Sequence, residues 1–382
     1  MTTVKFGIIG CGLMGREFAS AAARWCHLLD MDLRPEVVAV CNRTLSPQKL
    51  DWFRDNFDSI KHITDDYKQL LDNSEVEAVY IAVPHNMHKE IYCAAIEAGK
   101  HLLGEKPFGI DLDACESILK AMKSQPRTLV RCSSQYIFYP AVQRILQMIE
   151  QGQFGQVIEI ESGFSHCSDL DPSKPVNWKR MVDVNGRYGC MGDLGFHNAL
   201  VGIRAGWLPQ NVRAICSNLV TRRPNSAGDT VECETFDNAS LLAEVHDEKC
   251  GETFPWTLKI HRIMPGERNT WYLSIYGTKT SARFSLKNPK CLEILRYEGK
   301  EQAWQKIDMG FETSYKTITG SIFEFGSVDA FMQLMAAFMY ELENGKPMSF
   351  AAACPTPEEM YGCHKFFTAA LRSNDNRTVE SV

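Results

Sequence analysis

The stretch VKFGIIGCGLMGREFASAAARW, residues 4–25, decides the fold of the first part of this chain. It begins as a nearly continuous apolar run, typical of a strand buried on both faces of a parallel sheet, and ends in residues that favour a helix. Between them stands G-x-G-x-x-G, which in this setting is typical of a turn around a dinucleotide pyrophosphate. We therefore expect cofactor contacts from Gly10, Gly12, Leu13, Met14 and Gly15.

The same strand–helix alternation continues along the first third of the chain. Further apolar runs at 37–42, 78–83, 100–105 and 128–133 are separated by helical stretches. This order predicts an α/β protein whose residues 1–134 form a doubly wound parallel sheet, a Rossmann domain. After Gly152 the strands alternate and are joined by turns, which predicts a mostly antiparallel open sheet in a substrate-binding and oligomerisation domain, residues 135–382.

Composition excludes several classes of partner. With 41 Lys and Arg against 47 Asp and Glu, the net charge of -6 gives no reason to expect nucleic acid or an anionic membrane. No apolar run reaches the roughly 18 residues of a membrane span, and because the sequence enters a strand pattern at once we expect no signal peptide. The 14 cysteines stand singly, without a CxxC pair, so we expect reduced thiols, no zinc site and a cytoplasmic protein.

The end of the second predicted strand concerns the choice of cofactor. An acidic residue there usually binds the ribose hydroxyls of NAD, whereas this chain has Asn42 followed by Arg43. A neutral amide beside a guanidinium can accommodate a 2′-phosphate, which an acid would repel. We therefore favour NADP(H) over NAD(H), although Arg43 as an ordinary surface residue is the alternative.

Several motifs together resemble the Gfo/Idh/MocA oxidoreductase family, and the resemblance runs nearly end to end. They are GCGLMG (10–15), IAVPHNMH (81–88), GKHLLGEKP (99–107), QGQFGQVIEIESGFSH (151–166), GDLGFH (192–197), WYLSIYGTKTSARF (271–284) and FEFGSVDAFMQLMAAFMYELENGKPM (323–348). The resemblance implies a Rossmann domain followed by an α/β domain whose open sheet covers the nicotinamide end of the cofactor. It also implies oxidation or reduction of hydroxyl or carbonyl groups on sugars, cyclitols and related polyols.

Carried over residue by residue, the family's catalytic set becomes Lys106, Asp193 and His197. The chemistry of these side chains agrees with that role. Alcohol oxidation needs a base, and a histidine has a pKa near working pH; a lysine stabilises alkoxide character, and an aspartate orients a hydroxyl or the imidazole. Around Lys106 we expect a cis peptide bond before Pro107. The remaining expected cofactor contacts are Pro84, His88 and Glu105.

Substrate contacts are expected from Tyr136 and from the polar, turn-rich segment 169–189, in which Trp178, Lys179 and Arg180 suit a hydroxylated ligand. A solvated loop with one anchoring tryptophan is an equal alternative. The chain departs from the family where Tyr136 replaces part of an arginine pair and Leu200 replaces a second aspartate, so substrate identity does not transfer. We expect no metal at His85 and His88, because the family that the chain resembles needs none.

Three further expectations concern packing. The glycines around Asp193 should let the chain pass close to a ligand. An apolar sheet face with Trp256, Leu258 and Ile260 should be free to form a homodimer or homotetramer. The last ten residues, 373–382, should be frayed.

Two alternative functions remain open on the same scaffold. One is a glycoside hydrolase that keeps a bound nicotinamide cofactor, and the other is a non-catalytic ligand-sensing protein. Retention of Lys106, Asp193 and His197 favours the oxidoreductase.

Overall fold

The computed structural model describes residues 2–310 and 312–382. The chain forms two compact units: a first unit of residues 2–139 and 312–357, and a second unit of residues 140–310 and 358–382. The first unit thus includes a segment from late in the chain. The expected domain boundary at residue 134 stays a prediction.

The first unit contains a six-stranded parallel sheet in the order β3-β2-β1-β4-β5-β6. Its strands are β1 (Thr2–Ile9), β2 (Leu33–Cys41), β3 (His62–Thr64), β4 (Ala78–Ile81), β5 (His101–Glu105) and β6 (Val130–Ser133). The helices are α1 (Leu13–Ala23), α2 (Pro47–Asn56), α3 (Tyr67–Asp72), α4 (His88–Glu97), α5 (Leu112–Met122) and α9 (Ser327–Asn344). Short helices η1 (Trp25–His27), η2 (His85–Met87) and η3 (Gln135–Phe138) complete it.

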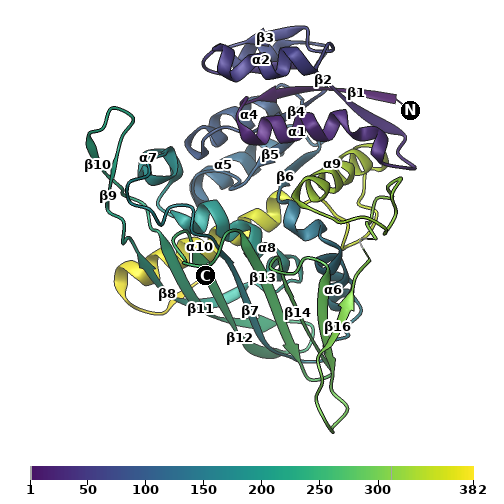
Figure 1. Ribbon diagram of the computed structural model, residues 1–382, viewed down its shortest axis with the longest axis vertical. Helices are drawn as coiled ribbons and strands as arrows, with labels where there is room; N and C mark the ends of the chain where they lie inside the picture. Colours follow the sequence, from purple (N-terminus) through teal and green to yellow (C-terminus); the bar gives the residue numbers. More distant parts are fainter. Residues whose placement is uncertain (1, 311) are drawn as a thin grey trace. The chain divides into compact units, whose positions relative to one another are not determined.

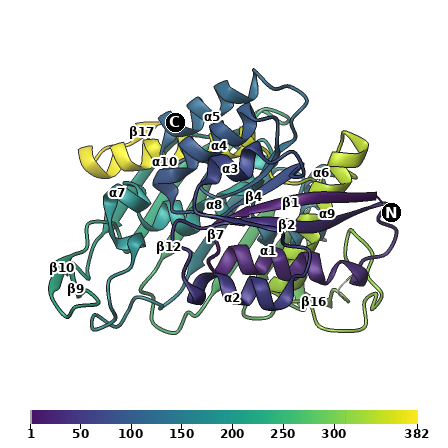
Figure 2. The same ribbon diagram turned by 90° about the horizontal axis from the view of Figure 1, so that it is seen from above.

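Helices cover both faces of this sheet, as its continuous apolar strands require. Figure 2 shows α1 and α2 on one side of the sheet and α3, α4 and α5 on the other. The Phe6 ring on β1 lies 5.1 Å from the Phe18 ring and 6.1 Å from the Phe338 ring, so α9 packs beside α1. The expected doubly wound Rossmann sheet is confirmed.

The second unit contains a nine-stranded sheet in the order β16-β15-β14-β13-β7-β12-β11-β8-β17, antiparallel except for the pair β7–β12 (Figure 1). Its strands are β7 (Val157–Ser165), β8 (Pro209–Ser217), β11 (Asn238–Asp247), β12 (Glu252–His261), β13 (Thr270–Gly277), β14 (Thr280–Ser285), β15 (Cys291–Arg296), β16 (Gln305–Asp308) and β17 (Glu380–Ser381). A separate hairpin pairs β9 (Arg222–Pro224) with β10 (Thr230–Glu232). The helices are α6 (Pro140–Glu150), α7 (Val182–Asn185), α8 (Phe196–Arg204), α10 (Pro357–Asn376), η4 (Trp178–Arg180) and the π-helical η5 (Met191–Gly195).

The expectation that Trp256, Leu258 and Ile260 form a free face is wrong. All three are fully buried, and the Trp256 ring packs 5.5 Å from the Phe366 ring of α10. Because side chains alternate along a strand, the opposite face of β12 carries Lys259, which is exposed. We call this opposite face the outer face of the sheet.

The C-terminal residues are not frayed as expected. Helix α10 continues to Asn376, and β17 then pairs with β8 through Glu380 and Ser381. The Ser373 hydroxyl oxygen accepts a hydrogen bond from the Ala214 N–H at 2.9 Å. Within the described ranges we find no helix with the length and apolar character needed to cross a membrane.

Candidate active site

The glycine turn after β1 has the geometry that its sequence predicts. Gly10 has a φ of +104°, and a Cβ there would lie 2.2 Å from the Ala82 carbonyl oxygen. A Cβ at Gly15 would lie 2.1 Å from the Gly10 carbonyl oxygen, so this glycine permits close packing of α1. At Gly12, by contrast, a Cβ would meet no atom within 4 Å.

This open space at Gly12 fits a pyrophosphate. Gly12 is also the N-cap of α1 and supplies no side-chain cap to the N–H groups of the first turn. Uncapped N–H groups at a helix N-terminus bind phosphate oxygens and are favoured by the helix dipole. Leu13 is largely exposed and Met14 partly exposed on the same turn.

Asn42 and Arg43 differ in what they contact. The Asn42 amide accepts the N–H of Cys11 at 3.1 Å and donates to the Thr44 carbonyl at 2.8 Å. It therefore ties the end of β2 to the glycine turn. Arg43 is exposed, and among the described residues its guanidinium makes no ion pair or side-chain hydrogen bond. Its charge is thus available to a ligand phosphate.

The end of β5 presents Glu105 and Lys106 side by side. Glu105 is buried and accepts the Tyr80 hydroxyl at 2.6 Å. Burial raises the pKa of Glu105, while the charge of Lys106 and this hydrogen bond act in the opposite direction. Lys106 is half-buried directly after the strand, at the carboxyl edge where parallel sheets bind ligands. The expected cis peptide bond joins it to Pro107.

His88 ties two turns at this edge together. Its Nδ1 lies 2.7 Å from the Pro107 carbonyl oxygen, and its Nε2 lies 2.9 Å from the Val83 carbonyl oxygen. Burial, reinforced by the charge of Lys106, lowers the pKa of His88 to about 4. The ring is therefore neutral at pH 7 and donates to one of the two carbonyls. Pro84 is the N-cap residue of η2 between these turns.

In the second unit, Asp193 is the centre of a charged cluster. It lies on the π-helical turn η5 and is buried. The Lys179 ammonium lies 2.8 Å from its Oδ1 and 3.0 Å from its Oδ2. The Arg262 guanidinium lies 3.1 Å from Oδ2. One carboxylate is thus held between two cations, of which sequence reasoning had identified only Lys179.

His197 follows on α8 and is buried. Its ring centroid lies 6.0 Å from that of Phe164 on β7, and its carbonyl accepts the Trp271 indole N–H at 3.2 Å. The wider π-helical turn before α8 changes the spacing that a regular helix would give Asp193 and His197. Both belong to the second unit, as their motif predicts.

His166 is a further residue of this cluster that sequence reasoning missed. Burial lowers the pKa of His166 to about 4; the charge of Asp193 opposes this effect, and the charges of Arg262 and Lys179 strengthen it. The His166 Nδ1 accepts the N–H of Ser168 at 3.3 Å, so the neutral ring carries its proton on Nε2. The only signal for it was its position at the end of the motif 151–166.

The glycines around Asp193 serve packing inside the protein, and the expectation of a close ligand approach is wrong for two of them. A Cβ at Gly195 would lie 2.7 Å from Ile260 and Phe367. A Cβ at Gly189, whose φ is +57°, would lie 2.7 Å from the Phe236 backbone nitrogen.

The expected substrate contacts separate into two groups. Trp178 and Lys179 are each partly exposed, and the Lys179 ammonium lies 5.9 Å from the Trp178 ring. Arg180 is fully buried and pairs with Asp237 at 2.5 Å, so it holds the segment in place and does not contact solvent. Tyr136 of η3 is 7% exposed in the first unit.

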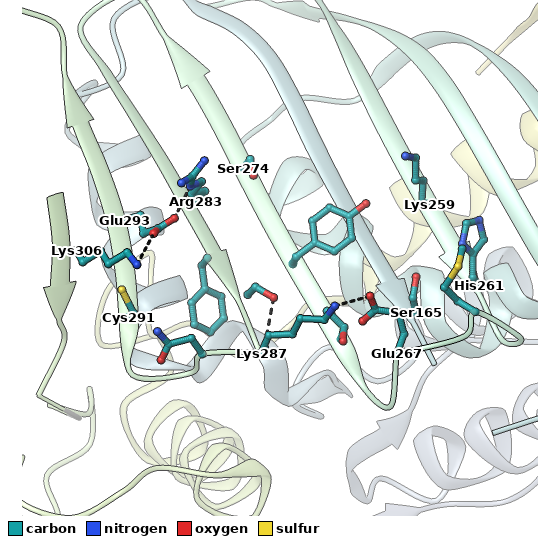
Figure 3. Close-up of a pocket in the computed structure, with 16 residues that line it drawn as sticks. Ser165, Lys259, His261, Glu267, Ser274, Arg283, Lys287, Cys291, Glu293 and Lys306 are labelled. Atoms are coloured by element: carbon teal, nitrogen blue, oxygen red, sulfur yellow. Dashed lines mark hydrogen bonds and ion pairs between the residues drawn. The ribbon is translucent and has the colours of Figure 1, made fainter. Parts of the chain in front are cut away.

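A cavity of about 620 Å³ lies elsewhere, on the outer face of the second sheet (Figure 3). Lys287 reaches Glu267 across it at 2.5 Å, while Arg283 and Lys306 both approach Glu293. Its other lining residues include Lys259, His261 and Tyr272. None of the expected catalytic residues lines it. In the described part of the chain, no group of three His, Cys, Asp or Glu side chains is arranged to hold a metal ion.

A doubly wound parallel sheet with a glycine turn after its first strand is typical of a domain that binds a dinucleotide. Residues 4–132 match the family model described as an oxidoreductase family with an NAD-binding Rossmann fold. This match covers the Rossmann part of the chain and agrees with the expected resemblance to the Gfo/Idh/MocA oxidoreductase family.

Relatives and solved structures agree with this assignment. The chain is 27% identical over 331 residues to levoglucosan dehydrogenase of Pseudarthrobacter phenanthrenivorans, covering 82% of this chain and 80% of that protein. It is 27% identical over 201 residues to a glycosyl hydrolase family 109 protein of Bacteroides thetaiotaomicron, covering 49% and 40% of the two chains. A levoglucosan dehydrogenase structure in complex with NADH and L-sorbose superposes with a TM-score of 0.87 at 20% identity, covering 100% and 99%, and this likeness shows the fold.

Proposed function

We propose that the protein is an NAD(P)-dependent dehydrogenase that oxidises a hydroxyl group of a sugar, cyclitol or related polyol, or reduces the matching carbonyl. The observation that carries the proposal is the cluster of the second unit, in which Asp193, Lys179 and Arg262 present charged hydrogen-bonding groups beside the buried motif of His197. Such groups recognise hydroxyls. The similarity to levoglucosan dehydrogenase supports a sugar as the substrate.

The chain's own residues have to manage the proton of the reacting hydroxyl. When bound, the nicotinamide nucleotide accepts or donates the hydride. His197 takes the hydroxyl proton during oxidation and returns it during reduction. Lys106 donates to the same oxygen and stabilises its alkoxide character. Asp193 keeps the surrounding cations in place, and Lys179 and Trp178 contact the substrate, with Tyr136 as a further contact.

A screen of possible substrates tests this proposal. Reduced-nicotinamide absorbance is followed with a sugar and cyclitol library and both cofactors. We expect turnover with at least one polyol, and a loss of about 10²- to 10⁴-fold in kcat for His197→Ala and for Lys106→Ala. Wild-type turnover in both variants would remove these residues from the mechanism.

The proposed cofactor preference is NADP(H) over NAD(H). Its support is the absence of an acid at Asn42 and the exposure of the neighbouring Arg43. We expect Arg43→Ala to raise KM for NADPH by about 10-fold, the worth of one charge-assisted contact, and to leave KM for NADH within about twofold. An equal effect on both cofactors would contradict the preference.

A glycoside hydrolase that uses transient oxidation is the second candidate, favoured by the similarity to the glycosyl hydrolase family 109 protein. It would cleave a glycoside with tightly bound cofactor and no net change in nicotinamide absorbance. Cleavage assays run beside the screen separate the two. A purely ligand-sensing protein would show neither activity.

The assembly and location are proposed as well. A homodimer or homotetramer would form through the outer face, where Ile215 and Leu242 are 63% and 55% exposed on neighbouring strands. Light scattering showing only monomer at micromolar concentration would contradict this, and Leu242→Lys should weaken association.

A cytoplasmic location is supported by the 14 cysteines, which form no disulfide.

A further inference from the structure

Arg262 makes contacts that go beyond neutralising Asp193. Its side chain is 1% exposed, and its Nη2 donates to Asp193 Oδ2 at 3.1 Å. Its Nη1 donates at 3.3 Å to the backbone carbonyl of Lys179. The same guanidinium therefore holds both the carboxylate that binds the Lys179 ammonium and the backbone from which that side chain emerges.

The position of Arg262 is itself fixed by the strand end that carries it. Its backbone N–H donates to the Asp237 carbonyl at 2.9 Å and to the Asn238 side chain at 3.2 Å. The Thr235 hydroxyl gives the Lys179 carbonyl a second donor at 2.8 Å. The residues that follow β12 and precede β11 thus fix the segment around Lys179, although Arg262, Thr235 and Lys179 are far apart in sequence.

The two cations on Asp193 differ in exposure. The Lys179 side chain is 39% exposed, whereas the Arg262 side chain is almost completely buried. Of these two cations, Lys179 is therefore the one that can reach a ligand, while Arg262 acts inside the protein. Asp193 joins them, with one oxygen nearer to each cation.

We infer that Arg262 is a positioning residue that, through Asp193 and the Lys179 carbonyl, aims the Lys179 ammonium at a hydroxyl oxygen of the substrate. The inference rests on the proposed polyol oxidoreductase function. It makes Lys179 a specificity-determining donor and gives Asp193 the task of connecting the two cations.

The test compares four variants of the whole chain. Arg262→Gln removes the charge, Arg262→Lys keeps it without the planar fork, and Arg204→Gln is the matched control. Arg204 is equally buried in the same unit and pairs with Glu359 at 2.7 and 3.0 Å. Because Arg262→Gln alone leaves a buried carboxylate short of a partner, Arg262→Gln with Asp193→Asn provides a second, uncharged version of the pair.

We expect Arg262→Gln to raise KM for the polyol by about 10- to 100-fold, the usual cost of a lost charged hydrogen bond, with a smaller change in kcat. KM for the nicotinamide nucleotide should stay within about twofold. Arg262→Lys should recover part of the loss, because its ammonium can pair with Asp193 and cannot also serve the Lys179 carbonyl. Arg204→Gln should change stability and leave both KM values near wild type.

Hydrogen exchange measured by mass spectrometry supplies a readout without substrate. Amides of residues 177–181 should exchange faster in both Arg262→Gln proteins than in wild type or in Arg204→Gln. Equal exchange in all proteins, or an unchanged KM for the polyol, would overturn the inference. If the wild type turns over no polyol while exchange at 177–181 responds as expected, the proposed function fails and the positioning of Lys179 by Arg262 stands.

Discussion

Two buried carboxylates, one in each unit, are held in opposite ways. Glu105 receives a neutral donor, the Tyr80 hydroxyl, and burial raises its pKa. Asp193 receives two cations, Lys179 and Arg262. The first arrangement tolerates loss of the charge, whereas the second depends on it, because two positive groups have been brought together around one negative group.

The two carboxylates also differ in how far along the chain their partners lie. Glu105 stands next to Lys106 in a single short motif, and its partner Tyr80 belongs to the neighbouring strand β4. The cations on Asp193 come from an irregular segment and from the end of β12. A carboxylate of the second kind connects separate parts of its unit, so its removal should disturb more of the structure.

The largest expected effect is therefore the loss of unfolding free energy caused by Asp193→Ala. Removing the carboxylate leaves the Arg262 guanidinium buried without a counter-charge, which typically costs about 3–5 kcal/mol of unfolding free energy. Guanidinium chloride unfolding, followed by tryptophan fluorescence, measures the loss. The control is Asp51→Ala, which breaks an exposed ion pair with Arg54 and should cost less than about 1 kcal/mol. Equal losses in the two variants would contradict the two-cation description.

Tyr80→Phe should have a smaller effect on the other carboxylate. It removes the 2.6 Å hydrogen bond to Glu105 and leaves a buried oxygen with one partner fewer, a cost of about 1–3 kcal/mol. The chain offers a surface counterpart, since the Tyr67 hydroxyl donates to Glu90 at 2.5 Å in an exposed position. Water replaces that donor, so Tyr67→Phe should change unfolding free energy by less than about 0.5 kcal/mol. Thermal unfolding of both variants checks the difference.

The sequence predicted the elements whose chemistry is local. The glycine turn, the Rossmann sheet, and the Glu105–Lys106 pair each depend on neighbours in one motif or on regular alternation. Arg262 and His166 could not be found in this way, because they join Asp193 only after strands from distant parts of the chain have assembled. Arg180 looked like a surface cation for the same reason, since its partner Asp237 lies far along the chain.

The outer face of the second sheet shows a different limit of prediction from sequence. Alternation along β12 gives two faces but does not say which one helices cover. Large apolar side chains at Trp256, Leu258 and Ile260 are better evidence for the covered face, because burial of such side chains drives the packing of α8 and α10. The polar residues between them, among them Lys259, belong to the outer face.

The smallest effect is the one that separates the two carboxylates most directly. Glu105→Gln keeps the shape of the side chain and can still accept from Tyr80, so unfolding free energy near pH 7 should change by less than about 1 kcal/mol.

The sign of the pH dependence of this stability difference is the informative result. The folded-state pKa of Glu105 is raised, so the folded protein holds this proton more tightly than the unfolded chain does. Wild type therefore loses stability relative to Glu105→Gln as pH rises above about 4.3, the usual pKa of a glutamate, and up to the folded-state value. Each unit of that shift is worth about 1.4 kcal/mol. Urea unfolding of both proteins at several pH values gives the difference directly, because the other titrating groups are shared. If the variant instead became less stable relative to wild type with rising pH, the charge of Lys106 would dominate over burial, and Glu105 would be held as Asp193 is.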